Sequence, residues 1–321
     1  MKLSIVTTLY RSATTINEFY RRAMAAAESI TQDIELVMVN DGSPDDSLVL
    51  ALALHRADPR VVVVDLSRNF GHHKALMTGL AHATGDLVFL VDSDLEEEPE
   101  LLTCFHKRFS QGDCDVVYGV QESRRGGWFE RISGALFFFL VNRLSDQFLP
   151  PNTAIARLIS REYVRSLIRH RDREFLIGNL FQAAGFRQIP VPIEKRSSSQ
   201  TTYSLGMRIE MAVKYLTTTS TRLLYAIFYF GVLIFALSVI AILFYVSRYL
   251  HSGIGVDGFT SLIVSIWLFG GLTTLILGVI GIYVANIFSE TKRRPYTYVR
   301  EVYRAQSDVA SKVVRVHGSH S

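Results

Sequence analysis

Two aspartates, Asp92 and Asp94, are the residues whose type and spacing point most directly to chemistry. They follow the apolar run Val88–Val91 in the stretch VFLVDSDLEEEPE, and four glutamates come soon after them. Residues i and i+2 of an extended chain share a face, so both carboxylates are predicted to point into one space. Carboxylate oxygens are ligands that Mg²⁺ and similar hard cations prefer. The stretch is therefore either a divalent-metal site or a solvated acidic turn.

The glutamates that follow have an ordinary structural explanation. Glu96, Glu97 and Glu98 precede Pro99, and Glu100 comes next. This pattern is typical of the start of a helix, where acidic groups favour the positive end of the helix dipole. The prediction divides the stretch at Leu95, with metal ligands before it and a helix opening after it.

The elements that position these residues are predicted from alternating apolar and helical patterns. The strands are predicted at 4–10, 34–40, 61–67, 86–92 and 114–120, and helices at 16–30, 48–57 and 72–84. This alternation indicates an α/β domain with a mostly parallel sheet covered on both faces. Ligands in such sheets bind beyond the carboxyl ends of the strands. Tyr10, Asp41, Asp92 and Asp94 are therefore predicted to converge on one crevice.

Phosphate-binding loops of the common kinds are absent from the sequence. No GxGxxG follows the first predicted strand and no GxxxxGK[ST] occurs. The phosphates of a bound nucleotide would then need another partner, and a metal held by carboxylates is the obvious candidate. The 34 basic and 30 acidic residues give a net charge of only +4, which does not indicate a nucleic-acid partner.

The C-terminal part of the chain is strongly apolar. The chain is 49% hydrophobic, and residues 223–247 and 259–288 carry no charged side chain. A helix needs about 20 apolar residues to cross a bilayer, so the two stretches predict a two-helix transmembrane hairpin. Arg222 and the basic run at 292–294 flank the hairpin on its outer sides. The positive-inside rule then places the preceding domain in the cytoplasm.

Four regions follow from these patterns. They are a core at 1–127, a second part of the same domain at 128–222, the transmembrane helices at 223–289 and a cytoplasmic basic tail at 290–321. Two segments, 128–148 and 204–222, are predicted to be interfacial helices lying among lipid headgroups. A buried helix of the soluble domain is the alternative for the first of them. No chemistry is predicted for the tail.

The order and spacing of four motifs resemble glycosyltransferase family 2. They are VNDGSPDDS (39–47), RNFG (68–71), GLAHATGD (79–86) and DSD (92–94). The similarity extends from residue 3 to about 290 and is strongest to the polyprenyl-phosphate glycosyltransferase and dolichyl-phosphate mannose synthase branch. It implies a GT-A fold and the inverting transfer of one sugar from a nucleotide-sugar, with UDP expected, to undecaprenyl phosphate. It also implies the bacterial inner membrane, the lipid bilayer as a partner, a homo-oligomer, and a role in cell-surface glycan or lipopolysaccharide modification.

The resemblance implies roles for individual residues. Asp92 and Asp94 would hold Mg²⁺ or Mn²⁺ on the donor diphosphate, and the catalytic set adds Arg124 and Arg131. The implied nucleotide-binding residues are Thr7, Leu9, Tyr10, Asp41, Lys74 and Asp92. The implied acceptor-phosphate residues are Arg124, Arg125, Arg131 and Arg157. Arginine suits phosphate through its fork of donors, although a basic flank attracted to anionic lipid is the alternative for the first three. His72 and His73 are interpreted as a surface pair or a diphosphate contact.

The sequence also departs from the family pattern. Relatives often carry Gln-Asp-Pro-Pro at 96–99 and P-x-Y-N-E after the first strand, and this chain has neither pattern. They also often carry G-D-F-R at 154–157, where this chain has Ala-Ile-Ala-Arg. Ile155 thus replaces the acid that might act as a base. An attacking hydroxyl needs a base, whereas a phosphate monoester, with a second pKa of about 6, is largely dianionic at pH 7. The departure favours a lipid-phosphate acceptor. A non-catalytic membrane scaffold of the same fold is the alternative, and a processive polysaccharide synthase is disfavoured because no Q-x-x-R-W occurs.

Overall fold

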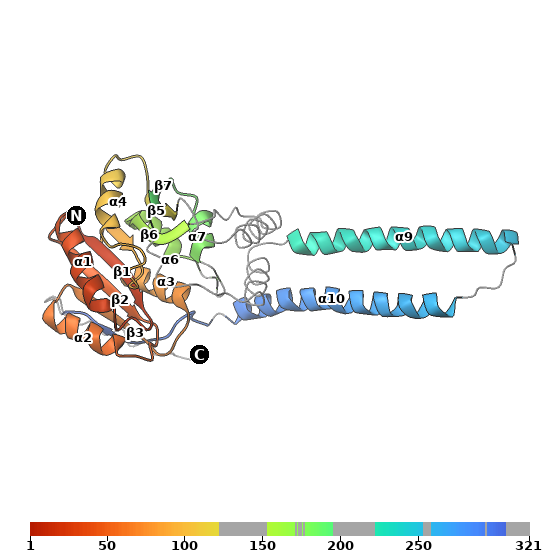
Figure 1. Cartoon of the computed structure of the whole chain (residues 1–321), viewed down its shortest axis with the longest axis horizontal. Coiled ribbons are helices and arrows are strands. Elements are labelled where there is room, and N and C mark those ends of the chain that lie inside the picture. The colour runs from red at the N-terminus through yellow and green to blue at the C-terminus, as the bar shows by residue number, and fades with distance from the viewer. Residues whose placement is uncertain are drawn as a thin grey trace, which may run out of the picture.

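An α/β domain carries two long helices that extend away from it (Figure 1). The computed structural model describes residues 1–121, 153–170, 172, 175, 177–194, 222–252, 258–292 and 294–305. The strands are β1 Leu3–Leu9, β2 Ile34–Asn40, β3 Val61–Leu66, β4 Leu87–Leu90, β5 Val116–Gln121, β6 Thr153–Ser160, β7 Gln188–Ile193 and β8 Val299–Tyr303. The helices are α1 Ile16–Glu28, α2 Ser47–Ala57, α3 His72–His82, α4 Leu101–Phe109, α6 Arg161–Ile168, α7 Ile177–Ala183, α9 Arg222–Ser252 and α10 Phe259–Thr291.

The strands form one mixed sheet in the order β7-β5-β6-β4-β1-β2-β3-β8. Strands β4, β1, β2 and β3 pair in parallel, as do β5 and β7. Strand β6 runs antiparallel to β4 and β5, and β8 runs antiparallel to β3. The predicted α/β fold with a mostly parallel sheet is confirmed. The two antiparallel strands were not predicted.

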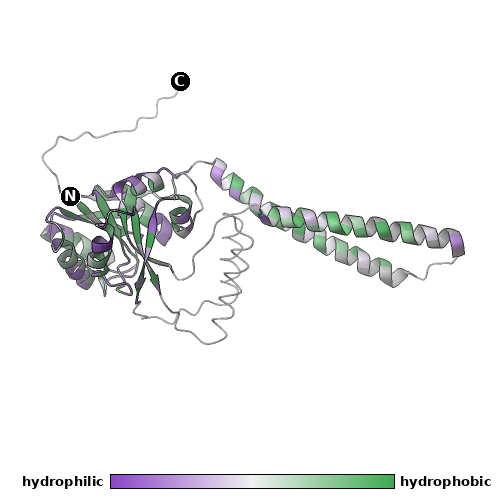
Figure 2. Ribbon diagram, turned by 90° about the horizontal axis from the view of Figure 1, so that it is seen from above, coloured by the Kyte–Doolittle hydropathy of each residue, from purple (hydrophilic) through white to green (hydrophobic). Residues whose placement is uncertain are grey.

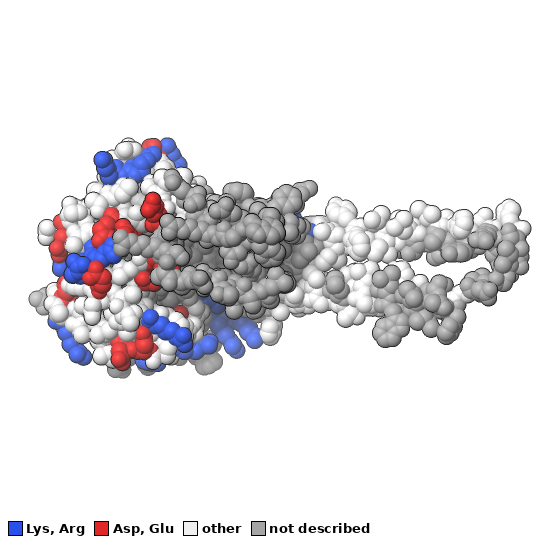
Figure 3. Space-filling model, in the orientation of Figure 1, with Lys and Arg blue, Asp and Glu red and all other residues white. Residues whose placement is uncertain are grey.

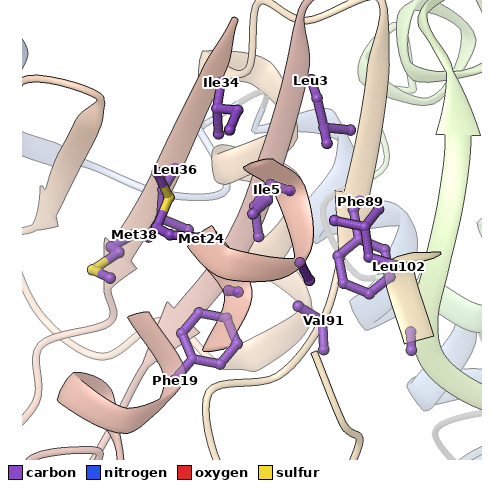
Figure 4. Packing of buried hydrophobic residues seen from close by; sticks show 14 of the residues in the cluster. Leu3, Ile5, Phe19, Met24, Ile34, Leu36, Met38, Phe89, Val91 and Leu102 are labelled. Atoms are coloured by element: carbon purple, nitrogen blue, oxygen red, sulfur yellow. The ribbon is translucent and has the colours of Figure 1, made fainter. Parts of the chain in front are cut away.

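Both faces of the central sheet are buried, which explains the continuous apolar runs of its strands. On one face, helix α1 places Phe19 and Met24 against Ile5, Leu36 and their neighbours (Figure 4). On the other face, α3, α6 and α7 cover a second cluster that includes Val6 and Tyr163. Full burial of a large apolar side chain contributes about 1.5–3 kcal/mol, so these two layers fix the strand ends on which the polar residues sit.

The two long helices are apolar along most of their described length (Figure 2). Among the described residues on the face shown, charged side chains gather on the α/β domain and at its junction with the helices (Figure 3). Large apolar side chains such as Phe228 and Ile287 are more than half exposed, which is unusual on a water-facing surface. Within the described residues, one stretch, Phe269–Thr291, is long and apolar enough to cross a membrane. It overlaps most of the predicted second span, 259–288, and the span predicted in α9 stays a prediction.

The segment after α10 returns to the α/β domain. Residues predicted as part of a basic tail form β8, the edge strand beside β3. Val299, the first residue of β8, pairs with Leu66, the last residue of β3. The chain therefore enters the sheet at the edge where β3 ends. The predicted interfacial segments, 128–148 and all but the last residue of 204–222, lie outside the described residues.

Candidate active site at the carboxyl ends of the strands

Asp41, directly after β2, is bound to the loop that follows β3. Its side chain is only 2% exposed, and its two carboxylate oxygens accept hydrogen bonds from the backbone N–H groups of Phe70 (2.7 Å) and Gly71 (3.0 Å). Burial raises the pKa of Asp41 above its usual range, and the two hydrogen bonds act in the opposite direction. Asp41 thus holds the RNFG motif in place, and its predicted contact with a nucleotide stays a prediction.

Gly42 lets the loops after β2 and β3 touch. Its φ is +59°, in the left-handed region that favours glycine. A Cβ added at this position would overlap the backbone of Arg68 and Asn69. The glycine of the DGS motif is therefore required both by its own conformation and by the close approach of the RNFG loop.

His72, the first residue of α3, connects the RNFG loop to the predicted metal ligands. Its Nδ1 lies 3.0 Å from the hydroxyl of Thr8 at the end of β1, and its Nε2 lies 3.4 Å from Oδ1 of Asp92. Its ring also lies 5.7 Å from the ring of His73, as the predicted surface pair requires, and its contact with a diphosphate stays a prediction. The sequence signal for this site was that His72 begins a predicted helix directly after the RNFG motif.

The Asp-x-Asp turn is anchored through its middle residue. Strand β4 ends at Leu90, so Asp92 and Asp94 lie in the turn that follows it. Ser93 between them is buried, and its hydroxyl donates to the carbonyl of Thr8 (2.8 Å) and contacts the Ser12 hydroxyl (3.0 Å). Asp92 is half-buried and Asp94 is exposed, and both flank the inward-pointing serine. Because β4 ends before both aspartates, the rule that residues i and i+2 of a strand share a face does not apply to them, and their shared direction stays a prediction.

Two residues in the loops after β1 and β4 adopt a strained backbone. Arg11, after β1, has a φ of 55° and Leu95, after Asp94, has a φ of 61°. Residues other than glycine in this region cost about 1–3 kcal/mol and persist where the surrounding structure enforces them. The division predicted at Leu95 thus coincides with a sharp reversal of the chain that separates Asp94 from the glutamates.

The carboxylates fit a divalent ion that takes further ligands from its substrate. Within the described part of the chain, no group of three His, Cys, Asp or Glu side chains is placed to hold a metal. Asp92 and Asp94 supply hard oxygen donors just after the carboxyl end of β4. Mg²⁺ and Mn²⁺ are commonly bound by one or two carboxylates together with phosphate oxygens and water. The donor set is therefore suited to an ion bound with a diphosphate.

Glu97 has a role that the sequence interpretation missed. Helix α4 begins at Leu101 with Glu100 as its N-cap residue, so the predicted helix opening lies at Glu100, and Glu96–Glu98 precede the helix. Glu97 is 1% exposed, and its carboxylate accepts hydrogen bonds from the backbone N–H groups of Ile155 (3.2 Å) and Ala156 (2.6 Å) in β6. The sequence signal for this role was that relatives often carry an acidic residue, the Asp of Gln-Asp-Pro-Pro, at the position of Glu97. Glu97 ties the Asp-x-Asp turn to the strand that carries Ile155.

Arg157 is a buried cation. Its side chain is 4% exposed, its guanidinium lies 3.4 Å from the centre of the Phe181 ring, and it donates to the carbonyls of Ala154 and Ile155. Burial lowers the pKa of Arg157 to about 10, so it remains charged at neutral pH. Among the described residues, no carboxylate forms an ion pair with it.

The other predicted site residues are placed unevenly. The side chains of Thr7 and Leu9 are fully buried in β1, whereas Tyr10 after the strand end is 46% exposed. Lys74 is half-exposed in the first turn of α3. Arg124, Arg125 and Arg131 lie outside the described residues. The structure thus brings together Asp41, Asp92, Asp94 and His72, and it leaves the three arginines unplaced.

Comparisons with known proteins give the chain its relatives. The model of the family described as Glycosyl transferase family 2 matches residues 4–168. A Mycobacterium tuberculosis protein named as a glycosyltransferase is 46% identical over 94% of this chain and 89% of its own length. An undecaprenyl-phosphate 4-deoxy-4-formamido-L-arabinose transferase of Sodalis glossinidius is 30% identical over 93% of both chains. Among solved structures, glucosyl-3-phosphoglycerate synthase from Mycobacterium tuberculosis with Mn²⁺, UDP and phosphoglyceric acid matches with a TM-score of 0.47 and 20% identity, covering 67% of this chain and 78% of that one.

Proposed function

Because this chain belongs to glycosyltransferase family 2 and is a glycosyltransferase, we propose that it transfers one sugar from a nucleotide-sugar to a polyprenyl phosphate. The register of β8 carries the proposal. Val299 pairs with Leu66, so the chain leaving α10 reaches the sheet at its carboxyl-end edge. Asp41, Asp92 and His72 lie at the same edge. A donor site beside the base of an apolar helix suits an acceptor whose phosphate is attached to a membrane lipid.

The donor would bind at the crevice, and we propose a UDP-sugar. Asp92 and Asp94 would hold Mg²⁺ or Mn²⁺, which when bound stabilises the negative charge that develops on the departing diphosphate. His72 would face the same diphosphate from the start of α3. Asp41 would act through the RNFG loop that it holds, because both of its oxygens already accept backbone hydrogen bonds. Tyr10 and Lys74 remain proposed nucleotide contacts.

The acceptor would attack through a phosphate oxygen. That oxygen forms a bond to the anomeric carbon, the bond from this carbon to the nucleoside diphosphate breaks, and the configuration inverts. A phosphate with a second pKa of about 6 is largely dianionic at pH 7, so Ile155 in place of an acid is compatible with turnover. Arg157 supports an anionic acceptor, because this buried cation lies beside Ile155. Arg124, Arg125 and Arg131 are proposed to contact the same phosphate.

The membrane arrangement is proposed to be a hairpin of two spans. Helix α9 has 31 residues and α10 has 33, and at about 1.5 Å per residue each exceeds the roughly 30 Å of a hydrocarbon core. The flanking basic residues favour a cytoplasmic catalytic domain at a bacterial inner membrane. A homo-oligomer and a place in the synthesis or modification of cell-surface glycans belong to the same proposal.

A donor screen tests the proposed function. The purified full-length chain in detergent would be incubated with labelled UDP- and GDP-sugars, Mn²⁺ and undecaprenyl phosphate. We expect a labelled lipid product with one donor, and its loss in Asp94→Ala. The absence of product with every donor, together with no Mn²⁺-dependent nucleotide binding, would instead support a non-catalytic scaffold.

A further inference from the structure

Arg300, in the strand that follows α10, contacts two strand ends at once. Its Nη1 lies 3.1 Å from Oδ2 of Asp65, near the end of β3, and its Nη2 donates to the carbonyl of Ser67 (2.9 Å) at the start of the RNFG loop. The planar guanidinium presents its donors in a fixed fork, so one side chain sets the position of both acceptors. The sequence patterns gave no role to this part of the chain.

The first branch of these contacts leads from Asp65 to the loop after β2. Asp65 is 2% exposed, and its Oδ1 accepts a hydrogen bond from the side-chain amide of Asn40 (2.7 Å). The carbonyl oxygen of the same Asn40 side chain accepts from the backbone N–H of Ser43 (3.2 Å). Arg300 therefore compensates the buried carboxylate that orients Asn40, and Asn40 holds the DGS turn in which Asp41 lies.

The second branch leads from Ser67 to the Asp-x-Asp turn. The Ser67 N–H donates to the carbonyl of Tyr298 (2.9 Å), so this residue is held from both its N–H and its carbonyl by the segment after α10. Ser67 opens the loop whose Phe70 and Gly71 amides bind Asp41 and whose end places His72 against Asp92. The two branches thus end in the loops that carry Asp41 and His72.

We propose that Arg300 is a positioning residue of the donor site. By fixing the ends of β2 and β3 together, it holds the loops that carry Asp41 and His72 in the arrangement that binds the nucleotide diphosphate. The tail after the membrane helix is then a functional part of the catalytic domain. The proposal rests on the proposed function for its nucleotide, but the loop positions can be measured without any ligand.

The test compares three variants of the full-length protein in detergent. Arg300→Gln removes the charge and the fork, Arg300→Lys keeps the charge but not both contacts, and Glu301→Gln is a matched control on the next residue. Glu301 is exposed and its carboxylate accepts from Tyr303 within β8, not from a donor-site loop. Hydrogen exchange would be followed in peptides covering residues 41–47 and 67–72, and Mn²⁺-UDP affinity would be measured by calorimetry.

We expect faster exchange in both loops of Arg300→Gln, with an unchanged rate in strand β1. Because the Arg300 side chain is 59% exposed, its contribution is partly screened, and we expect nucleotide affinity to fall about threefold to tenfold. Arg300→Lys should recover part of the loss, Glu301→Gln should match the unchanged protein, and the apparent KM for the lipid acceptor should not change.

Three results would overturn the proposal. The first is a hydrogen-exchange rate in the two loops of Arg300→Gln equal to that of Glu301→Gln. The second is an equal rise in hydrogen exchange through the whole domain. The third is an unchanged Mn²⁺-UDP affinity in Arg300→Gln, provided that the wild-type protein binds Mn²⁺-UDP. If the wild-type protein binds no nucleotide, the proposed function fails, and the exchange rates alone still decide whether Arg300 positions the two loops.

Discussion

Replacing Asp41 by asparagine tests whether this residue organises the donor site through the RNFG loop. The carboxylate gives one oxygen to each of the Phe70 and Gly71 amides, whereas an asparagine side chain has only one acceptor oxygen. One amide then faces the NH₂ group and loses a hydrogen bond to a charged acceptor, worth about 1.5–3 kcal/mol. Removing the buried charge offsets part of this loss, but the NH₂ group, unlike either oxygen of a protonated carboxyl, cannot accept a hydrogen bond, so we expect a net destabilisation of about 1–2 kcal/mol.

Thermal unfolding of the full-length protein in detergent would measure the effect. For a domain of this size, 1 kcal/mol shifts the Tm by roughly 2–4 °C, so Asp41→Asn should lower it by about 2–8 °C. Asp46→Asn is the matched control, because Asp46 is exposed at the start of α2 and its side chain makes no capping hydrogen bond. The control should leave the Tm unchanged. Equal midpoints for the two variants would refute the assigned role of Asp41.

The pH dependence of this difference has a defined sign. Burial raises the pKa of Asp41, so the folded protein binds its proton more tightly than the unfolded chain does. The contribution of Asp41 to the free energy of unfolding is therefore larger below the raised pKa and falls as the pH rises through it. The Tm difference between wild type and Asp41→Asn should widen as the pH is lowered from 7. A difference that narrows on acidification would contradict this explanation.

Other substitutions test separate parts of the site. Glu97→Gln should lower the Tm by several degrees, since one of the two β6 amides, of Ile155 or Ala156, loses its acceptor at about 1–3 kcal/mol; an unchanged Tm would contradict this. Gly42→Ala should destabilise by at least about 1–3 kcal/mol, because a left-handed residue must also push against the RNFG loop; a neutral result in thermal unfolding would show that the loops can separate. Asp94→Asn should abolish Mn²⁺-dependent nucleotide binding in calorimetry while leaving the Tm unchanged, because Asp94 is exposed; retained binding would exclude Asp94 as a ligand.

Much of the sheet could be predicted because its strands are buried on both faces. Such strands read as continuous apolar runs, and β2 was predicted at its observed bounds, Ile34–Asn40. Strand β8 was not predicted, because an exposed edge strand has mixed composition and its Val299 and Val302 remain about 40% exposed. Its position depends on pairing with a strand more than two hundred residues earlier, which a local pattern does not contain.

In the candidate site too, features that depend on local patterns could be predicted, and features that depend on long-range pairing could not. The convergence of Asp41 with the Asp-x-Asp turn follows from their positions at the ends of parallel strands. The contacts of Glu97 with β6 and of Arg300 with β3 depend on antiparallel strands that pair across the sheet. Local patterns place a residue on an element, and long-range pairing decides what its side chain meets.

A comparison of two lipid acceptors tests the proposed chemistry most directly. The purified chain, its identified nucleotide-sugar and Mn²⁺ would be given undecaprenyl phosphate or undecaprenol, which differ only in the phosphate. Because Ile155 offers no base to an attacking hydroxyl, we expect labelled sugar in the phosphate-linked lipid and none in the alcohol. Equal transfer to undecaprenol, or transfer to neither lipid, would contradict the assignment of a polyprenyl phosphate as the acceptor.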